Sequence, residues 1–232
     1  MTQHILLDLD DTLSDPKVGI TQSIRYALTQ LNVNVPSEKR LIDCIGPPLS
    51  ESFADLLPHP SPKKVTEAIA LYRDRFSTTG LFENQLYNNI SLALTQLKAQ
   101  NAVLHLATSK PKVFAQQILE HFELTRYFTS IHGSELDGTR ALKSALIAHV
   151  LHQESISPEQ AIMVGDRSHD IVGAIANQMP AVGVLWGFGT YSELIEAGAT
   201  HILERPLELS NIPALMSKSL ISKSLMPNPS NA

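Results

Sequence analysis

Residues 5–13, ILLDLDDTL, join a short apolar run to a group of acids. The run over residues 5–9 is typical of a buried strand, and Asp8 and Asp10 fall at its carboxyl end. In a parallel sheet, ligands bind outside the carboxyl ends of the strands. Residues two apart on a continuing strand point the same way, so these carboxylates can converge. Converging acids repel unless a cation binds or one stays protonated. Taken alone, the stretch fits a solvated acidic turn equally well.

Further short apolar runs follow along the chain, and helical repeats lie between them. One repeat places Ile90, Ala93, Leu94 and Leu97 on a single helical face. The strand-like runs cover residues 102–107, 128–132, 161–164, 181–186 and 201–203. Alternating strands and helices favour a parallel sheet with helices on both faces. The sequence therefore predicts an α/β fold with a doubly wound, mostly parallel, Rossmann-like sheet.

Residues 15–89 interrupt this alternation and contain no convincing strand. Residues 24–31 and 65–76 form helical faces, and Gly46-Pro47-Pro48 between them cannot be helix interior. An insert of about 70 residues is far longer than a normal crossover, and such long connections are usually functional. We therefore predict an inserted all-helical cap over 15–89. The core would comprise 1–14 and 90–216, and residues 217–232 the end of a last helix and a disordered tail.

Composition narrows the class of protein. The net charge is −5, from 18 basic and 23 acidic residues, and no dense Lys/Arg run is present, which argues against a nucleic acid polymer as partner. The single cysteine, Cys44, cannot form an intramolecular disulfide, which fits a reducing compartment. The N-terminus does not resemble a signal peptide, and no apolar stretch approaches the roughly 20 residues of a membrane helix. We expect a soluble cytoplasmic protein with no membrane partner.

Two more acids follow the fourth predicted strand. Gly165 permits a tight turn, and Asp166 and Asp170 are four residues apart, so they share a face if a helix begins there. Acids also favour helix starts for capping reasons, which is the plainer interpretation of this pair.

Hydroxyls and lysines complete the pattern. Thr108 and Ser109 end the second predicted strand, where they can bind an anion at the start of a helix or simply cap it. Lys143 lies in a helical segment with buried neighbours, although a lone lysine usually lies on a solvated face.

Together, acids after strands one and four, hydroxyls after strand two and a lysine between strands three and four resemble the haloacid dehalogenase-like hydrolases. The resemblance covers roughly residues 5–209. The stretches GITQSIRYAL, IGPPLSESF, MVGDRSHDIVGA and GVLWGFGTYSELIEAGATHIL are similar to the phosphoglycolate phosphatase-like branch, some members of which are nucleotidases. The insert resembles the helical cap of these phosphatases.

The resemblance implies a phosphatase that hydrolyses a small phosphorylated metabolite through an aspartyl-phosphate. Asp8 would be the nucleophile and Asp10 the general acid and then base. Mg²⁺ would be held by the Asp8 carboxylate, the Asp10 backbone carbonyl and Asp166. Asp170 would act through a water or by orienting Lys143.

The same resemblance assigns Thr108, the Ser109 backbone and Lys143 to the phosphoryl oxygens. Ser109 stands where many members have Asn, and Asp11 where glycine is most common. Lys110 competes with Lys143 for the phosphate-binding role.

Several points stay open at this stage. Arg25 is our preferred cap residue for a second anionic group of the substrate, although a solvated helix face is the commoner role of such a residue. Phosphoglycolate and nucleoside monophosphates are both compatible with the sequence. So are a phosphomutase and a regulatory relative without catalysis. The sequence does not indicate an oligomeric state.

Overall fold

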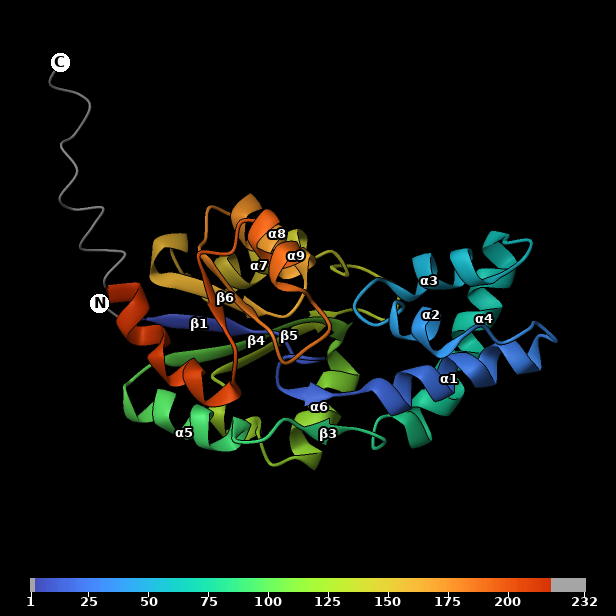
Figure 1. The fold of residues 1–232 in the computed structure, drawn as a ribbon, viewed down its shortest axis with the longest axis horizontal. Helices are drawn as coiled ribbons and strands as arrows, with labels where there is room; N and C mark the ends of the chain where they lie inside the picture. Colours follow the sequence, from blue (N-terminus) through green and yellow to red (C-terminus); the bar gives the residue numbers. More distant parts are fainter. Residues whose placement is uncertain (1–2, 218–232) are drawn as a thin grey trace, which may run out of the picture.

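Six parallel strands form the central sheet in the computed structural model, which describes residues 3–217 (Figure 1). Their order across the sheet is β5-β4-β1-β6-β7-β8, which places β1 between the two halves of the fold. The strands are β1 (His4–Leu7), β4 (Val103–Pro111), β5 (Ser130–Ser134), β6 (Ala161–Gly165), β7 (Ala181–Val184) and β8 (His201–Leu203). This is the order of a Rossmann-like doubly wound sheet, so the predicted fold class is confirmed.

All six predicted strands are present, but β1 ends two residues earlier than predicted. The chain turns after Leu7 because the backbone N–H groups of Leu13 and Ser14 both donate to the Leu9 carbonyl. Asp11 completes the turn at φ 60°, a left-handed conformation that favours glycine. This left-handed conformation explains why glycine is common at this position in the family that the sequence resembles.

Helices cover both faces of the sheet (Figure 1). On one face lie α7 (Lys143–Gln153), α8 (Ser168–Ala176) and α9 (Tyr191–Glu196), and on the other α5 (Ile90–Ala99) and α6 (Lys112–His121). Short 3-10 turns occupy Thr125–Tyr127, Pro158–Gln160 and Pro206–Asn211. Alternate strand residues feed two apolar cores: Leu6 and Met163 pack in one, Ile5, Leu7 and Val164 in the other. Burial on both faces explains why these strands read as continuous apolar runs.

The interrupting stretch forms a helical layer beyond the carboxyl ends of the strands (Figure 1). Its helices are α1 (Lys17–Gln30), α2 (Glu38–Ile42), α3 (Leu49–Leu56) and α4 (Pro62–Arg75), followed by a π-helical turn (Phe76–Gly80). We refer to residues 15–89 as the cap. Phe53, Tyr72 and Phe76 are buried, with Tyr72 stacked on Phe76 and edge to face with Phe53, which gives the cap an aromatic core.

The prediction that the insert contains no strand was wrong at its two ends. Two-residue strands β2 (Ser14–Asp15) and β3 (Gln85–Leu86) pair antiparallel where the chain enters and leaves the cap. A strand of two residues is too short to show in apolar periodicity. The pairing ties both connections of the cap to each other.

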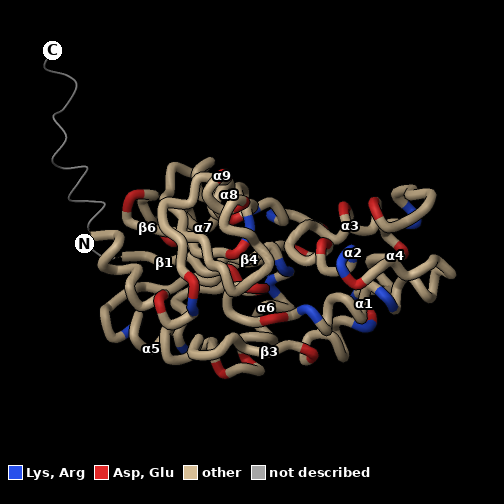
Figure 2. Tube along the Cα trace, viewed as in Figure 1, with Lys and Arg blue, Asp and Glu red and all other residues tan. Residues whose placement is uncertain are grey.

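The predicted tail lies outside the described residues except for Ser217. Within residues 3–217, no helix is both long enough and apolar enough to cross a bilayer. Charged positions gather where the strand ends face the cap, with acids and bases interspersed (Figure 2). This is the edge at which the sequence predicted a site.

Candidate active site

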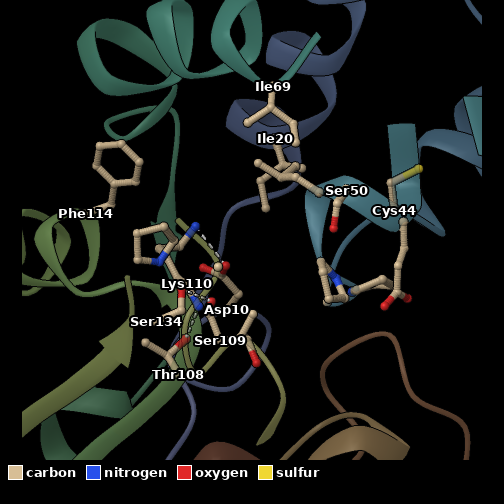
Figure 3. Close-up of a pocket in the computed structure, with 18 of the residues that line it drawn as sticks. Asp10, Ile20, Cys44, Ser50, Ile69, Thr108, Ser109, Lys110, Phe114 and Ser134 are labelled. Atoms are coloured by element: carbon tan, nitrogen blue, oxygen red, sulfur yellow. Dashed lines mark hydrogen bonds and ion pairs between the residues drawn. The ribbon is translucent and has the colours of Figure 1, made fainter. Parts of the chain in front are cut away.

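A cavity of about 740 Å³ lies between the strand ends and the cap (Figure 3). From the sheet side it is lined by residues that include Asp8, Asp10, Thr108, Ser109, Lys110, Lys143, Asp166 and Asp170. From the cap it is lined by residues that include Ile20, Cys44, Ile69, Tyr72, Arg73 and Phe76. With the exception of Arg25, every site residue predicted from the sequence lines this one cavity.

Three buried acids form the floor of the site. Asp8 follows β1, Asp166 follows β6, and Asp170 lies in the first turn of α8, with carboxylate oxygens all within 4.8 Å of one another. Burial, and then the charges of Asp170 and Asp8, hold the pKa of Asp166 well above its ordinary value. Burial likewise raises the pKa of Asp170 to about 6, although the Lys143 ammonium opposes the shift. The fold thus concentrates negative charge where water cannot screen it.

Lys143 offsets part of this charge. It is the first residue of α7, and its Nζ lies 2.8 Å from Asp8 Oδ1 and 2.6 Å from Asp170 Oδ1. The ammonium also donates to the Ala107 carbonyl at 2.9 Å. Burial alone would lower the pKa of Lys143, but the two carboxylates outweigh it and raise the pKa. The lysine therefore stays charged in the site.

Two glycines allow Asp170 of α8 to lie this close to Lys143 of α7. A Cβ on Gly165 would lie 2.2 Å from the Asp170 side chain, and a Cβ on Gly173 would lie 2.7 Å from Lys143 Cβ. Distances under 3.0 Å are essentially never seen for real Cβ atoms. Gly165 and Gly173 thus bring α8 close enough for Asp170 to meet Lys143.

A second ion pair holds the other acid of the first motif. Lys110, near the end of β4, places Nζ 2.8 Å from Asp10 Oδ2 and 4.6 Å from the centre of the Phe76 ring. Burial raises the pKa of Asp10, and the Lys110 charge opposes that shift. The two lysines therefore have separate partners: Lys143 contacts Asp8 and Asp170, and Lys110 contacts Asp10.

Thr108 and Ser109 line the cavity on the side of Asp10 and Lys110 (Figure 3). The Thr108 hydroxyl accepts a hydrogen bond from the Lys110 backbone N–H at 3.3 Å, and Ser134 donates to the Ser109 carbonyl at 2.8 Å. These bonds fix the irregular end of β4, where its register against β5 shifts. Each hydroxyl can also donate a hydrogen bond to a ligand in the cavity, because a hydroxyl both accepts and donates.

Arg25 does not lie in the cavity. Its guanidinium pairs with Glu38 in α2, on the partly exposed side of the cap. Arg73 of α4 lines the cavity instead and donates to the Leu136 carbonyl in the core at 2.6 Å. The periodicity of α1 identifies its buried face but not how that face is turned toward the site. The sequence therefore could not show that Arg73, rather than Arg25, lines the cavity.

Residues after β7 complete the site, and sequence reasoning assigned them no role. The Phe188 backbone N–H donates to Asp166 Oδ2 at 3.0 Å, and Trp186 Nε1 donates to the Thr12 carbonyl at 3.0 Å. A Cβ on Gly187 would lie 2.5 Å from both Asp166 and the Asp11 carbonyl. The two glycines of WGFG, Gly187 and Gly189, were the sequence signal for this contact, since the backbone can approach Asp166 this closely only without a Cβ.

The family model for haloacid dehalogenase-like hydrolases matches residues 5–184. The chain belongs to this family. Its acids and Lys143 are the groups that carried the resemblance in sequence, and here they lie around one cavity.

Similar proteins are named as phosphatases in several cases. The chain is 44% identical over 198 residues to a 5'-nucleotidase of Pseudomonas aeruginosa, covering 85% of this chain and 89% of that one. It is 36% identical to the tyrosine-protein kinase PtkA of Mycobacterium tuberculosis, covering 87% and 68%. A phosphoglycolate phosphatase of Shigella boydii is more distant, at 24% identity over 91% of each chain.

Among solved structures, a predicted phosphatase from Clostridium acetobutylicum superposes with a TM-score of 0.85 at 40% identity, covering 95% of this chain and 99% of that one. Family and relatives together make this haloacid dehalogenase-like protein a hydrolase of the phosphatase type, as the sequence predicted.

The acid cluster fits the Mg²⁺ that phosphatases of this family generally use. Mg²⁺ prefers oxygen ligands and is usually held by a few carboxylates. Lys143 is the cation that the structure places against this cluster, at Asp8 Oδ1 and Asp170 Oδ1, so its one positive charge faces three buried carboxyl groups. Burial, and then the charges of neighbouring acids, raise the pKa of Asp166 and Asp170, and a divalent cation would offset both effects.

Mg²⁺ should therefore stabilise the protein against heat. A ligand at 100 times its Kd adds about 2.7 kcal/mol, which corresponds to roughly 5–10 °C in Tm for a chain of this size. We expect this shift at pH 7.5 after removal of metal with EDTA and addition of Mg²⁺, measured by calorimetry. Asp166→Asn should abolish most of it, whereas Asp55→Asn, the same change on the exposed side of the cap, should not.

The shift should also depend on pH. The pKa of Asp170 is raised from 3.8 to about 6, so the metal-free protein loses stability as pH rises through this window, because the carboxyl must ionise in a buried site. Protons and Mg²⁺ compete for the same oxygens, so the Mg²⁺-dependent shift should shrink from pH 7.5 to pH 5. If Mg²⁺ raised the Tm of Asp166→Asn as much as it raises the Tm of the wild type, the assignment of the acid cluster as the Mg²⁺ site would be contradicted.

Proposed function

We propose that this protein is a Mg²⁺-dependent phosphatase that hydrolyses nucleoside 5'-monophosphates through an aspartyl-phosphate on Asp8. The observation that carries the chemistry is the placement of the Asp8 carboxylate at the floor of the cavity, 2.8 Å from the Lys143 ammonium. Carboxylates can act as nucleophiles toward phosphoryl groups. Lys143 holds one oxygen of Asp8, which fixes the carboxylate rotation and directs the other oxygen toward a substrate in the cavity.

In the first step an Asp8 oxygen attacks phosphorus, and the bond from phosphorus to the ester oxygen breaks. The departing alkoxide takes a proton from Asp10, whose pKa burial raises and which therefore holds a proton more readily than an exposed acid. Lys143, the Thr108 hydroxyl and the Ser109 backbone stabilise the charge on the phosphoryl oxygens. The products of this step are the free alcohol and phosphorylated Asp8.

In the second step water attacks the phosphorus of the aspartyl-phosphate. Asp10, now ionised, takes the proton from that water, and the bond between phosphorus and Asp8 breaks to release inorganic phosphate. Lys110 stabilises the ionised form of Asp10 from 2.8 Å. The acid and base roles thus fall on one residue, and both carboxylates return to their starting states.

Mg²⁺ enters this proposal through the acid cluster. Asp8, Asp166 and Asp170 would hold the ion, with the Asp10 carbonyl as a further oxygen ligand, and Asp170 would also orient Lys143. When bound, Mg²⁺ supplies positive charge that neutralises the phosphoryl oxygens. Phe188 keeps Asp166 in place by donating its backbone N–H to Oδ2.

The size and lining of the cavity favour a substrate larger than phosphoglycolate. About 740 Å³ is within the range of pockets that bind cofactor-sized molecules. On the cap side the lining includes the apolar side chains of Ile20 and Ile69, and Phe114 of α6 adds an aromatic ring from the core. These groups suit the face of a nucleobase better than a second carboxylate. The 5'-nucleotidase among the relatives, at 44% identity, supports the same substrate class. A cytoplasmic location, predicted from the sequence, agrees with such a substrate.

Asp8→Asn should retain the fold and lose turnover, because the amide is nearly isosteric but is not a nucleophile. Asp10→Asn should slow an ester with a poor leaving group by about 10²–10⁴-fold, the usual contribution of a positioned acid–base group. The rate of phosphate release and the circular dichroism spectrum check both. Asp43→Asn, on the exposed surface of the cap, is the matched control. More than a few per cent of wild-type activity in Asp8→Asn would overturn the role of Asp8.

Substrate choice should follow the cavity. We expect kcat/KM for at least one nucleoside 5'-monophosphate to exceed that for phosphoglycolate by tenfold or more, about 1.4 kcal/mol. Ile69→Trp, which fills the apolar cap side, should raise KM for the nucleotide and leave a small alkyl phosphate unaffected. A preference for phosphoglycolate over every nucleotide would reject the substrate class while leaving the chemistry intact.

A further inference from the structure

Arg167 joins the core to the cap at the wall of the cavity. Its Nη1 donates to the Ile45 carbonyl at 3.0 Å, a contact between residues 122 positions apart. Ile45 lies in the loop between α2 and α3, next to Cys44 and the Gly46-Pro47-Pro48 turn. Arg167 follows Asp166 directly in the chain. The residue after a candidate metal ligand thus bonds the tip of the cap.

The Arg167 side chain is held in this direction from the core side. Its Nε pairs with Glu193 Oε1 at 3.0 Å, and the same oxygen accepts the Ser168 backbone N–H at 2.9 Å. Glu193 is itself placed in the first turn of α9, which Thr190 caps. The guanidinium can make both bonds because its donors form a fixed, planar fork. Arg167 therefore reaches the cap from a rigid support.

The cap side is shaped to receive it. Gly46 adopts φ 104°, a left-handed conformation that turns the loop, and a Cβ there would lie 3.5 Å from Arg167 Nη1. Pro47 and Pro48 follow and restrict the loop further. Ile45 and Cys44 are 1% and 7% exposed, so the loop is packed rather than free.

A second bond runs in the opposite direction. Arg73 of α4 donates from the cap to the Leu136 carbonyl in the core loop between β5 and α7. Each layer therefore contributes one arginine to a backbone carbonyl of the other. A backbone carbonyl has no titratable charge, and rotation of a side chain does not move it. It is therefore a suitable acceptor for a contact that breaks and re-forms as the cap opens and closes.

We propose that Arg167 is a positioning residue that latches the cap over the site, with Glu193 as its support. Its side chain holds residues 44–48 at the cavity wall. Its backbone N–H donates to Asp170 Oδ2 at 3.2 Å and so helps to position the acid cluster. Closing a site in this way excludes bulk water from the reacting groups. The latch regulates access to the site of the proposed function, and its structural part can be tested without turnover.

Cys44 provides a built-in reporter for the latch. It is the only cysteine of the chain, is buried, and lines the cavity beside Ile45 (Figure 3). Because the Cys44 thiol is buried, we expect a thiol reagent such as 5,5'-dithiobis(2-nitrobenzoate) to react with it faster when the loop moves away from the core. The rate of this reaction in the full-length protein measures how often the latch opens.

Arg167→Met should raise the rate of Cys44 modification by about tenfold or more, the factor expected when a hydrogen bond with a charged donor is lost. Arg167→Lys should give an intermediate rate, because one ammonium does not replace the fork that bonds Glu193 and Ile45 together. Arg205→Met breaks a similar arginine–glutamate pair with Glu208 outside the cavity and should leave the rate unchanged. Inorganic phosphate with Mg²⁺ should slow the reaction in the wild type.

The urea dependence of the rate separates latch opening from unfolding. Local opening exposes little surface, so the accelerated reaction should change little with urea below the unfolding transition. A rate within twofold of the wild type in both Arg167 variants would overturn the latch. So would an acceleration that follows the loss of global stability. Either result leaves the proposed function standing, since loss of activity in Asp8→Asn tests that independently.

Discussion

The buried ammonium of Lys143 is the contact on which the site depends. Asp8, Asp166 and Asp170 place three carboxylates within 4.8 Å of one another at the end of a sheet, where burial makes each charge costly. Lys143 contacts two of them and a backbone carbonyl. Removing one partner of such a group leaves buried charge uncompensated, which typically costs about 3–5 kcal/mol. In the proposed mechanism, the lysine therefore serves folding and chemistry through the same contacts.

The position of Lys143 follows from the topology. β1 lies between β4 and β6, so Asp8 emerges between the loops that follow its two neighbours. α7 begins at the same edge because it connects β5 back to β6. Gly173 then lets α8 pack against the start of α7 and bring Asp170 to the lysine. Residues scattered over 160 positions of sequence meet because parallel strands bring their carboxyl ends to one edge.

The sequence predicted these elements well because their signals are local. Short apolar runs marked all six strands, and the order of acids, hydroxyls and lysine after them marked the candidate site. The sequence carried no signal for contacts that depend on how the cap is oriented over the core. The direction of Arg25 depends on the orientation of α1 over the core, and the contact of Arg167 with Ile45 spans 122 positions. The carboxylate partners of Lys110 and Lys143 likewise needed the structure, because only geometry shows that Lys110 contacts Asp10 and Lys143 contacts Asp8.

Direct capture of the covalent intermediate tests the central claim most sharply. In Asp10→Asn, an aryl phosphate with a good leaving group needs no acid for the first step, whereas the second step lacks its base, so phosphorylated Asp8 should accumulate. Reduction of the quenched protein with borohydride converts an aspartyl-phosphate to homoserine, which peptide mass spectrometry locates. The account predicts homoserine at position 8, and none there when Asp8→Asn is added to the same variant. Phosphate release without any trapped residue, or a trapped residue at another position, would contradict it.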